Sequence, residues 1–213
     1  MDLSEVSTHI RAGFDAKTSA RDIGLAASRN AVRSCGNAIR ALHRYEQEAA
    51  EKLLGEARSH LDEARDALSD HPDILHAGFI HDAEKEYAEA RITHALVTGA
   101  DFPDPASLQV PPSAFLKGMA EAIGELRRHI LDLMRHRELK RCEELLGAMD
   151  DMYYVLTSMD YPDGITFGLR RLTDVARGII ERTRGDFTTS AIQSSLHDAL
   201  EAHTKIIEDS SEA

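Results

Sequence analysis

The sequence has few residues that break helices and few that build aromatic binding platforms. Six prolines are spread over 213 residues, tryptophan is absent, and aromatic residues make up 5% of the chain. The only cysteines are Cys35 and Cys142. Two cysteines exclude a disulfide framework, and their positions match no metal-ligand spacing. We therefore expect two buried thiols in a reducing compartment.

A long apolar run is also missing. No segment approaches the roughly 18 consecutive apolar residues that a membrane-spanning helix requires. The first residues, Met1 to Glu5, lack the basic and apolar segments of a signal peptide. These features predict a cytoplasmic protein with no membrane partner.

Positive charge is scarce and comes mostly from one residue type. The formal net charge is -12, and the 25 basic residues include only six lysines. An acidic, lysine-poor surface suits a salt-rich cytoplasm, so we expect a halophilic source. The acidic average argues against nucleic-acid binding, because phosphate contacts need a positive footprint. If such a footprint exists, it must be local.

Long stretches between the prolines are rich in Ala, Leu, Glu and Arg, and their apolar residues recur with a helical period. This pattern predicts an all-α fold, a bundle of about seven helices. We expect them at about 5–45, 46–69, 74–98, 113–136, 138–159, 164–183 and 188–207. Ala100–Pro112 is the one long loop. No linker divides the chain, so we predict a single domain over 1–213, with its core at about 17–207 and a frayed tail at 208–213.

One stretch of the first predicted helix carries positive charge only. From Ile23 to Tyr45 there is no Asp or Glu, although the chain contains 37 acidic residues. Four arginines in this stretch fall within about 60° of one another around a helix; they are Arg29, Arg33, Arg40 and Arg44. They could pair with acidic helices elsewhere in the bundle. Alternatively, they form a track for nucleic-acid phosphates, which the arginine fork contacts bidentately.

Two predicted helices carry glutamates at helical spacing. Glu86 and Glu89 are three residues apart, and Glu121 and Glu125 are four apart, so each pair shares one face of its helix. Four converging carboxylates would form an all-oxygen site suited to Mg²⁺ or Mn²⁺. The alternative is a set of solvated side chains, because Glu-rich helices carry such pairs by chance. A di-iron bundle is excluded, since no histidine has a glutamate three residues before it.

Several short motifs occur in a consistent order and spacing. They are Ser28–Asn30, Ala41–Arg44, Glu86–Ala90, Leu116–Gly118 and Gly124–Arg128. Together these motifs resemble the translin family, and most of all the archaeal type of its translin-associated factor X branch. The resemblance spans about residues 17–190.

This resemblance implies a helical bundle that assembles into closed oligomers, often octamers, which enclose RNA. The assembly would be a homo-oligomer or would include a translin-like sister chain. Members of the factor X branch are metal-dependent endoribonucleases, whereas the translin branch mainly binds RNA and single-stranded DNA. Matched residue by residue, the catalytic and metal-binding acids are Glu86, Glu89, Glu121 and Glu125. Glu121 stands where the family has an aspartate, so the side chain that carries this carboxylate is longer by one methylene.

Three functions are consistent with these patterns. The leading interpretation is an Mg²⁺-dependent or Mn²⁺-dependent endoribonuclease that acts on single-stranded RNA within an oligomer. The alternative is an oligomer of the same fold that binds RNA or single-stranded DNA without catalysis. A third is a helical scaffold that contacts no nucleic acid. The glutamates separate the first from the second, and the arginines separate both from the third.

Overall fold

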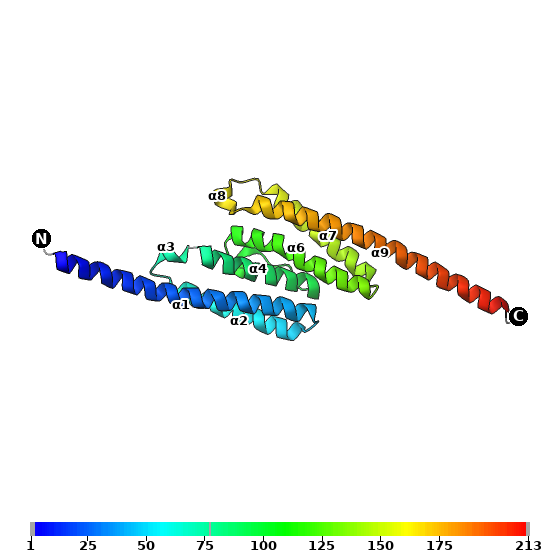
Figure 1. The fold of residues 1–213 in the computed structure, drawn as a ribbon, viewed down its shortest axis with the longest axis horizontal. Helices are drawn as coiled ribbons and strands as arrows, with labels where there is room; N and C mark the ends of the chain where they lie inside the picture. The colour runs from blue at the N-terminus through cyan, green and yellow to red at the C-terminus, as the bar shows by residue number, and fades with distance from the viewer. Residues whose placement is uncertain (1–2, 77, 212–213) are drawn as a thin grey trace. The chain divides into compact units, whose positions relative to one another are not determined.

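The computed structural model describes residues 3–76 and 78–211, and every regular element in these ranges is a helix (Figure 1). The long helices are α1 (Leu3–His43), α2 (Gln47–Ala67), α4 (Gly78–Thr98), α6 (Pro112–Arg135), α7 (Leu139–Ser158) and α9 (Leu169–Ser211). The single-turn helices are α3 (Pro72–Leu75), α5 (Pro105–Leu108) and α8 (Asp163–Thr166). The predicted all-α class is confirmed. Within the described ranges, no helix combines the length and apolarity needed to cross a membrane.

The last two helices that the sequence predicted, at 164–183 and 188–207, form one continuous helix from Leu169 onwards. α9 is continuous to Ser211, where the sequence predicted a break between residues 183 and 188 and a frayed tail from residue 208. Gly185 weakens a helix by only about 1 kcal/mol. Arg127 of α6 spans the expected break, because it donates to Thr183 Oγ1 at 3.1 Å and to Asp186 Oδ2 at 2.8 Å. Residues 212 and 213 of the predicted tail lie outside the described residues.

The chain forms two compact units, which divide within α6 between Ala122 and Ile123. The first contains α1 to α5 and the beginning of α6, and the second contains the rest of α6 with α7 to α9. Each unit is described by itself below. The single domain expected from the sequence stays a prediction.

In the first unit, α1 and α2 form a hairpin along an alanine-rich seam, and α4 packs against both (Figure 1). Buried residues recur every three or four positions on the two facing sides. They are Ala27, Ala31, Cys35, Ala38 and Leu42 on α1, and Leu54, Ala57, Leu61 and Ala64 on α2. At Gly24, a Cβ would lie 2.6 Å from Leu68 Cδ1. Small side chains therefore let these helices approach closely.

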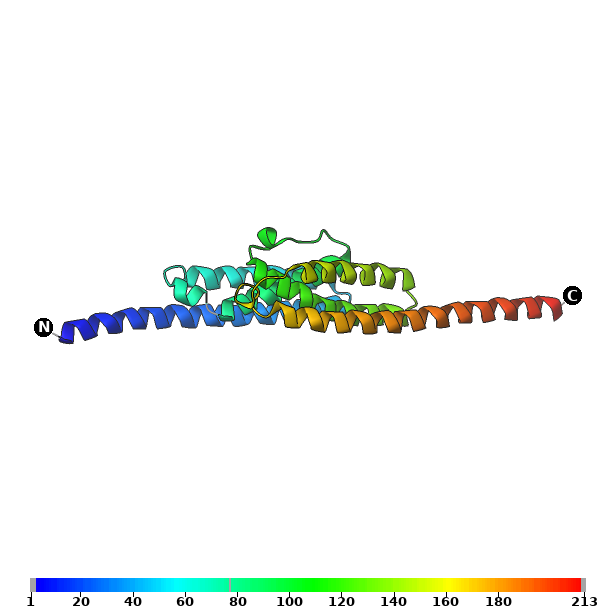
Figure 2. The same ribbon diagram turned by 90° about the horizontal axis from the view of Figure 1, so that it is seen from above.

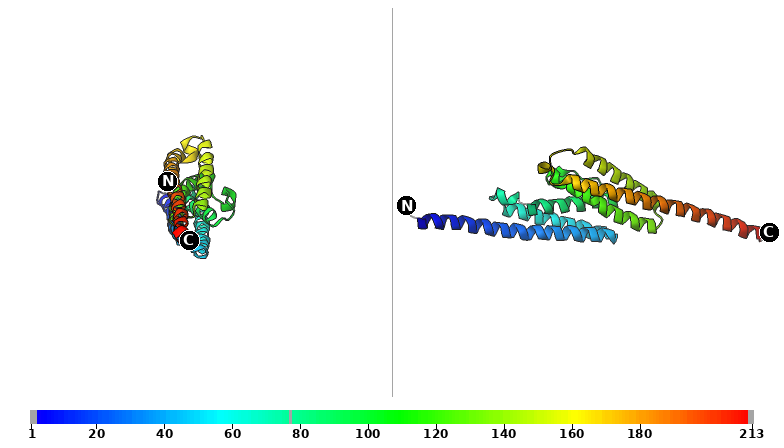
Figure 3. Two further views of the ribbon diagram at one scale, coloured as in Figure 1. Left: turned by 90° about the vertical axis from the view of Figure 1, so that its right-hand side faces the viewer. Right: turned by 45° about the horizontal axis from the view of Figure 1, so that its top comes forward.

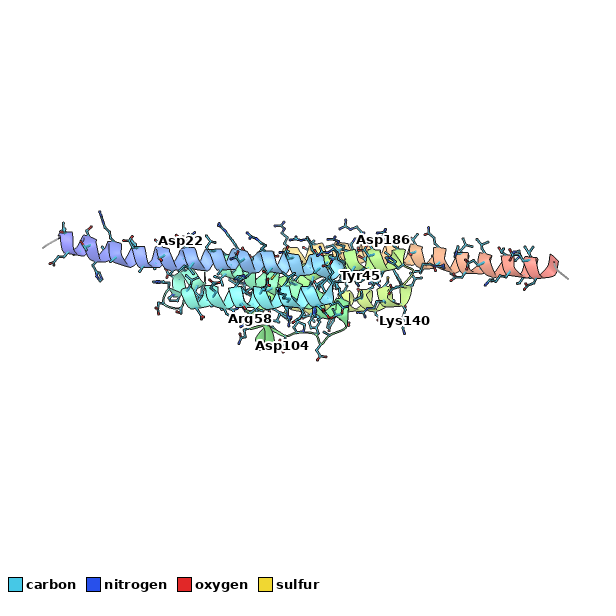
Figure 4. All side chains as sticks on the ribbon, turned by 90° about the horizontal axis from the view of Figure 1, so that it is seen from below. Asp22, Tyr45, Arg58, Asp104, Lys140 and Asp186 are labelled. Atoms are coloured by element: carbon cyan, nitrogen blue, oxygen red, sulfur yellow. The ribbon has the colours of Figure 1, made fainter. Side chains whose placement is uncertain are left out.

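Two arginines of α2 hold the loop that leads into α6. Arg58 Nη1 donates to the Leu108 carbonyl at 2.7 Å, and Arg65 Nη2 donates to the Gln109 carbonyl at 2.7 Å. The sequence predicted an irregular loop here, but the loop contains α5, which Asp104 caps. Figure 2 shows the loop in green standing away from the helices of its unit, and Figure 4 shows Arg58 beside the part that carries Asp104. The arginines thereby fix where α6 begins.

In the second unit, α7 lies beside the first half of α9, and α8 contacts α9 (Figure 3). The core includes Leu126 and Ile130 of α6, Leu145 and Met149 of α7, and Ala176 and Ile180 of α9. Cys142 is buried here, and its thiol contacts the Ile130 carbonyl at 3.6 Å. Cys35 is buried in the first unit. Both thiols are free, as predicted.

Candidate metal centre and arginine stripe

The candidate metal centre depends on a close approach between α4 and α6. Gly118 of α6 faces the backbone of α4, and a Cβ at this position would lie 2.7 Å from both the Glu89 nitrogen and the Lys85 carbonyl oxygen. A side chain larger than hydrogen would therefore push the two helices apart. A second contact fixes their register, because His81 Nε2 and Ser113 Oγ form a hydrogen bond at 2.9 Å.

Three of the four predicted glutamates converge in the first unit. One carboxylate oxygen from each of Glu86, Glu89 and Glu121 lies within 4.8 Å of the other two. Glu89 is buried, whereas the side chains of Glu86 and Glu121 are 29% and 30% exposed. The cluster therefore has one interior carboxylate and two on an open side.

This set of donors suits a hard divalent cation. Oxygen ligands of Mg²⁺ lie about 2.1 Å from the ion and so about 3 Å from one another. Small rotations of the glutamate side chains would close the present separation. The donors are all carboxylate oxygens, which favour Mg²⁺ or Mn²⁺ over softer metals.

Cys35 of α1 borders the same cluster but keeps its proton. Burial, followed by the charges of Glu86 and Glu89, raises the pKa of the Cys35 thiol well above its ordinary value. A neutral thiol is a poor metal ligand. Cys35 is also not among the residues whose ligand atoms converge at the cluster, which are Glu86, Glu89 and Glu121.

Glu125, the fourth predicted acid, follows Glu121 by one turn of α6. It is half-buried and belongs to the second unit. Its place among the metal ligands stays a prediction. Glu84, which was not a candidate, is buried on α4 and pairs with Arg65 Nη2 at 2.7 Å.

Lys85 is a site residue that sequence reasoning missed. Its Nζ lies 2.8 Å from Glu86 Oε1 and 2.5 Å from Glu121 Oε2, and its side chain is 13% exposed. Burial opposes the charged form, but the hydrogen bonds and charges of Glu121 and Glu86 outweigh it and raise the pKa of Lys85. The only sequence signal was its position between two glutamates on α4. That pattern is equally typical of a solvated helix face.

The four predicted phosphate-contacting arginines are all exposed, three of them on α1 and Arg44 in the turn that follows it, and we call them the arginine stripe. Arg44 pairs with Glu46 in the turn that follows α1, at 2.7 and 2.9 Å. Arg40 donates to the neutral side chain of Asn37. Among the described residues, Arg29 and Arg33 have no acidic partner. The ion pair observed is thus local to the turn after α1, and Asp82 of α4 lines the same shallow hollow as Arg29. Its role in binding stays a prediction.

No family model matches the sequence. An uncharacterized protein of Methanocaldococcus jannaschii is 29% identical over 174 residues, which cover 81% of this chain and 77% of that protein. The apo form of NeC3PO, at 17% identity and a TM-score of 0.72, covers 89% of this chain and 97% of its own and shares the fold.

A nearer likeness is to AfC3PO, solved by itself and in complex with duplex RNA. Both structures superpose with a TM-score of 0.80 and 31% identity, over 91% of this chain and 98% of theirs. The fold and the sequence therefore agree over almost the full length of both chains. This chain belongs to the translin family, and the solved structures that it resembles are those of C3PO proteins.

Proposed function

We propose that this protein binds RNA and hydrolyses it at a divalent-cation centre formed by Glu86, Glu89 and Glu121, with Glu125 as a fourth ligand. The observation that carries the proposal is the convergence of three carboxylates from α4 and α6. These positions match the catalytic acids of the nuclease branch that the sequence resembles. AfC3PO was solved with duplex RNA, which supports RNA as the polymer.

A bound Mg²⁺ or Mn²⁺ would supply an activated water and hold a phosphate oxygen during in-line displacement. Hydrolysis forms a bond between the water oxygen and phosphorus and breaks the bond from phosphorus to the departing ribose oxygen. An open-side carboxylate, that of Glu86 or Glu121, would accept the proton that the water loses, and a proton from solvent would go to the departing ribose oxygen. Buried Glu89 would anchor the centre from within.

The arginine stripe would supply the positive surface that RNA needs on a chain of net charge -12. Its guanidinium groups contact phosphates, which single strands and duplexes share. Arginine planes also stack on unpaired bases, and the chain has few aromatic residues to do so. We therefore expect single strands to bind more tightly than duplexes, with both forms recognised.

The test uses the full chain with end-labelled RNA, single-stranded and duplex, in Mg²⁺ and in EDTA at one fixed salt concentration. We expect cleavage in Mg²⁺ and none in EDTA. Glu89→Gln should abolish cleavage and leave RNA affinity within about twofold, because the charge it removes lies in the interior. Glu48→Gln, an exposed glutamate on α2, is the matched control and should change neither.

The alternative makes a different set of predictions. An oligomer that binds RNA or single-stranded DNA without catalysis would form a complex with the labelled strand in Mg²⁺ and leave that strand uncleaved. That result would contradict the proposed nuclease activity. Failure to bind RNA of either form would contradict both functions and favour a helical scaffold.

A further inference from the structure

A cation from the protein itself already occupies the open side of the carboxylate cluster. Lys85 extends from the same helix as Glu86 and reaches across to Glu121 on α6, with Nζ 2.8 and 2.5 Å from their oxygens. The contact joins the two helices whose separation Gly118 sets. Its side chain is 13% exposed, so solvent screens these contacts only weakly.

We propose that Lys85 is the internal counter-ion of the carboxylate cluster and that a divalent cation must displace its ammonium group in order to bind. Lys85 then sets the cation concentration at which the centre fills. This inference rests on the proposed function in one respect, namely that the cluster binds a divalent cation.

The argument for displacement is steric and electrostatic. A cation held by Glu86 and Glu121 would lie about 2.1 Å from their oxygens, in the space where Lys85 Nζ now makes its hydrogen bonds. Two positive groups cannot share that position, and the low exposure of the Lys85 side chain, 13%, limits how far solvent screens their repulsion. Lysine carries its charge on a flexible four-carbon stem, so the ammonium group can move out on the open side while its Cα stays on α4.

Displacement predicts a specific effect on cation affinity. The wild-type centre must give up two charge-assisted hydrogen bonds before it fills, whereas a centre without the ammonium gives up none. Removing that charge should therefore tighten cation binding by about tenfold or more. An arginine at this position keeps the charge and the hydrogen bonds, so it should preserve the wild-type behaviour.

The experiment measures Mn²⁺ binding by calorimetry on the full chain without RNA, at one pH and one salt concentration. Lys85→Met should bind Mn²⁺ at least about tenfold more tightly than wild type, and Lys85→Arg should stay within about threefold. Lys117→Met is the matched control. It removes the same charge one turn before Glu121, at a half-buried lysine that makes no ion pair among the described residues. Its affinity should stay within about threefold of wild type.

Circular dichroism establishes that each variant is folded, and Lys85→Gln replaces Lys85→Met if the latter is not. Equal affinity in wild type and the uncharged variant, with Glu89→Gln abolishing binding, would overturn the role of Lys85 and leave the metal centre standing. An equal gain in Lys117→Met would also overturn it, because the effect would then be one of general charge. Absence of Mn²⁺ binding in every form, Lys85→Met included, would overturn the centre and this inference together.

Discussion

Gly118 of α6 packs directly against the backbone of Glu89 on α4, with no room for a side chain between them. The spacing between the two glutamate-bearing helices is therefore set by a backbone contact. Substitutions in the surrounding apolar core can alter stability without altering this spacing, whereas a change at Gly118 must alter both.

Gly118→Ala should lower the free energy of unfolding by about 1–3 kcal/mol, because the new methyl group would overlap the α4 backbone. It should also weaken Mn²⁺ binding. Urea unfolding and calorimetry measure the two effects. Gly55→Ala is the control, since a Cβ there meets open space on α2. It should raise stability by about 0.4–1 kcal/mol. Wild-type stability and affinity in Gly118→Ala would contradict this account of the helix spacing.

Arg65→Ala should destabilise the first unit by about 2–4 kcal/mol in urea unfolding, because it leaves the buried carboxylate of Glu84 without its partner. It also releases the loop that Arg65 holds at Gln109. Arg91→Ala breaks a pair with Glu51, whose side chain is 55% exposed, so it should cost less than about 1 kcal/mol. A cost in Arg65→Ala no larger than in Arg91→Ala would rule out the buried pair as a major contributor.

Replacing Arg33 and Arg40 together by alanine should weaken RNA binding by about tenfold or more. The slope of log affinity against log salt should fall by roughly one per lost contact for duplexes, and by less for single strands. Filter binding at a series of salt concentrations gives both quantities. Arg171 and Arg182, exposed on α9, serve as the paired control. If both double variants bind as wild type does, the stripe is not the phosphate track.

We expect a closed homo-oligomer in light scattering rather than a 23.6 kDa monomer, because symmetric closure is the common form of soluble assemblies. Apolar side chains at helical spacing are exposed near the start of α1 and the end of α9; they include Leu3, Val6, Ile10 and Phe14, and Ile192, Leu196, Leu200 and Ile207. Leu196→Asp with Leu200→Asp should lower the mass of the assembly. Ser195→Asp with Ala202→Asp adds the same charge on another face and should leave the mass unchanged. A wild-type monomer at micromolar concentration would refute the expectation.

Stability should decline in alkali partly through Cys142. Burial, with a smaller contribution from Glu138, raises the pKa of this thiol from 9.0 to about 11. Folding thus favours the protonated thiol, so its contribution is complete below pH 9 and is lost as the pH rises towards 11. Urea unfolding across this range should show a steeper decline in wild type than in Cys142→Ala. Parallel declines would show that the thiol titrates normally.

The helices and the glutamate spacing could be predicted because both depend on local sequence. Proline positions and apolar periodicity locate α2, α4, α6 and α7, and the three-residue spacing puts Glu86 and Glu89 on one face. The continuity of α9 could not be predicted, since Arg127 supports it from a distant part of the chain. Lys85 was missed for the same reason: its partner Glu121 is 36 residues away. Nothing in the sequence around Lys85 says which way its side chain turns.

Lys85 also bears on the order in which the protein matures. Many small metal sites cannot form until the ion arrives, because the ligands repel one another and the chain stays unfolded without it. Here the ammonium group compensates part of that repulsion between α4 and α6 from within. The chain can therefore complete its fold without a cation, and the loading of the proposed metal centre would be a step separate from folding.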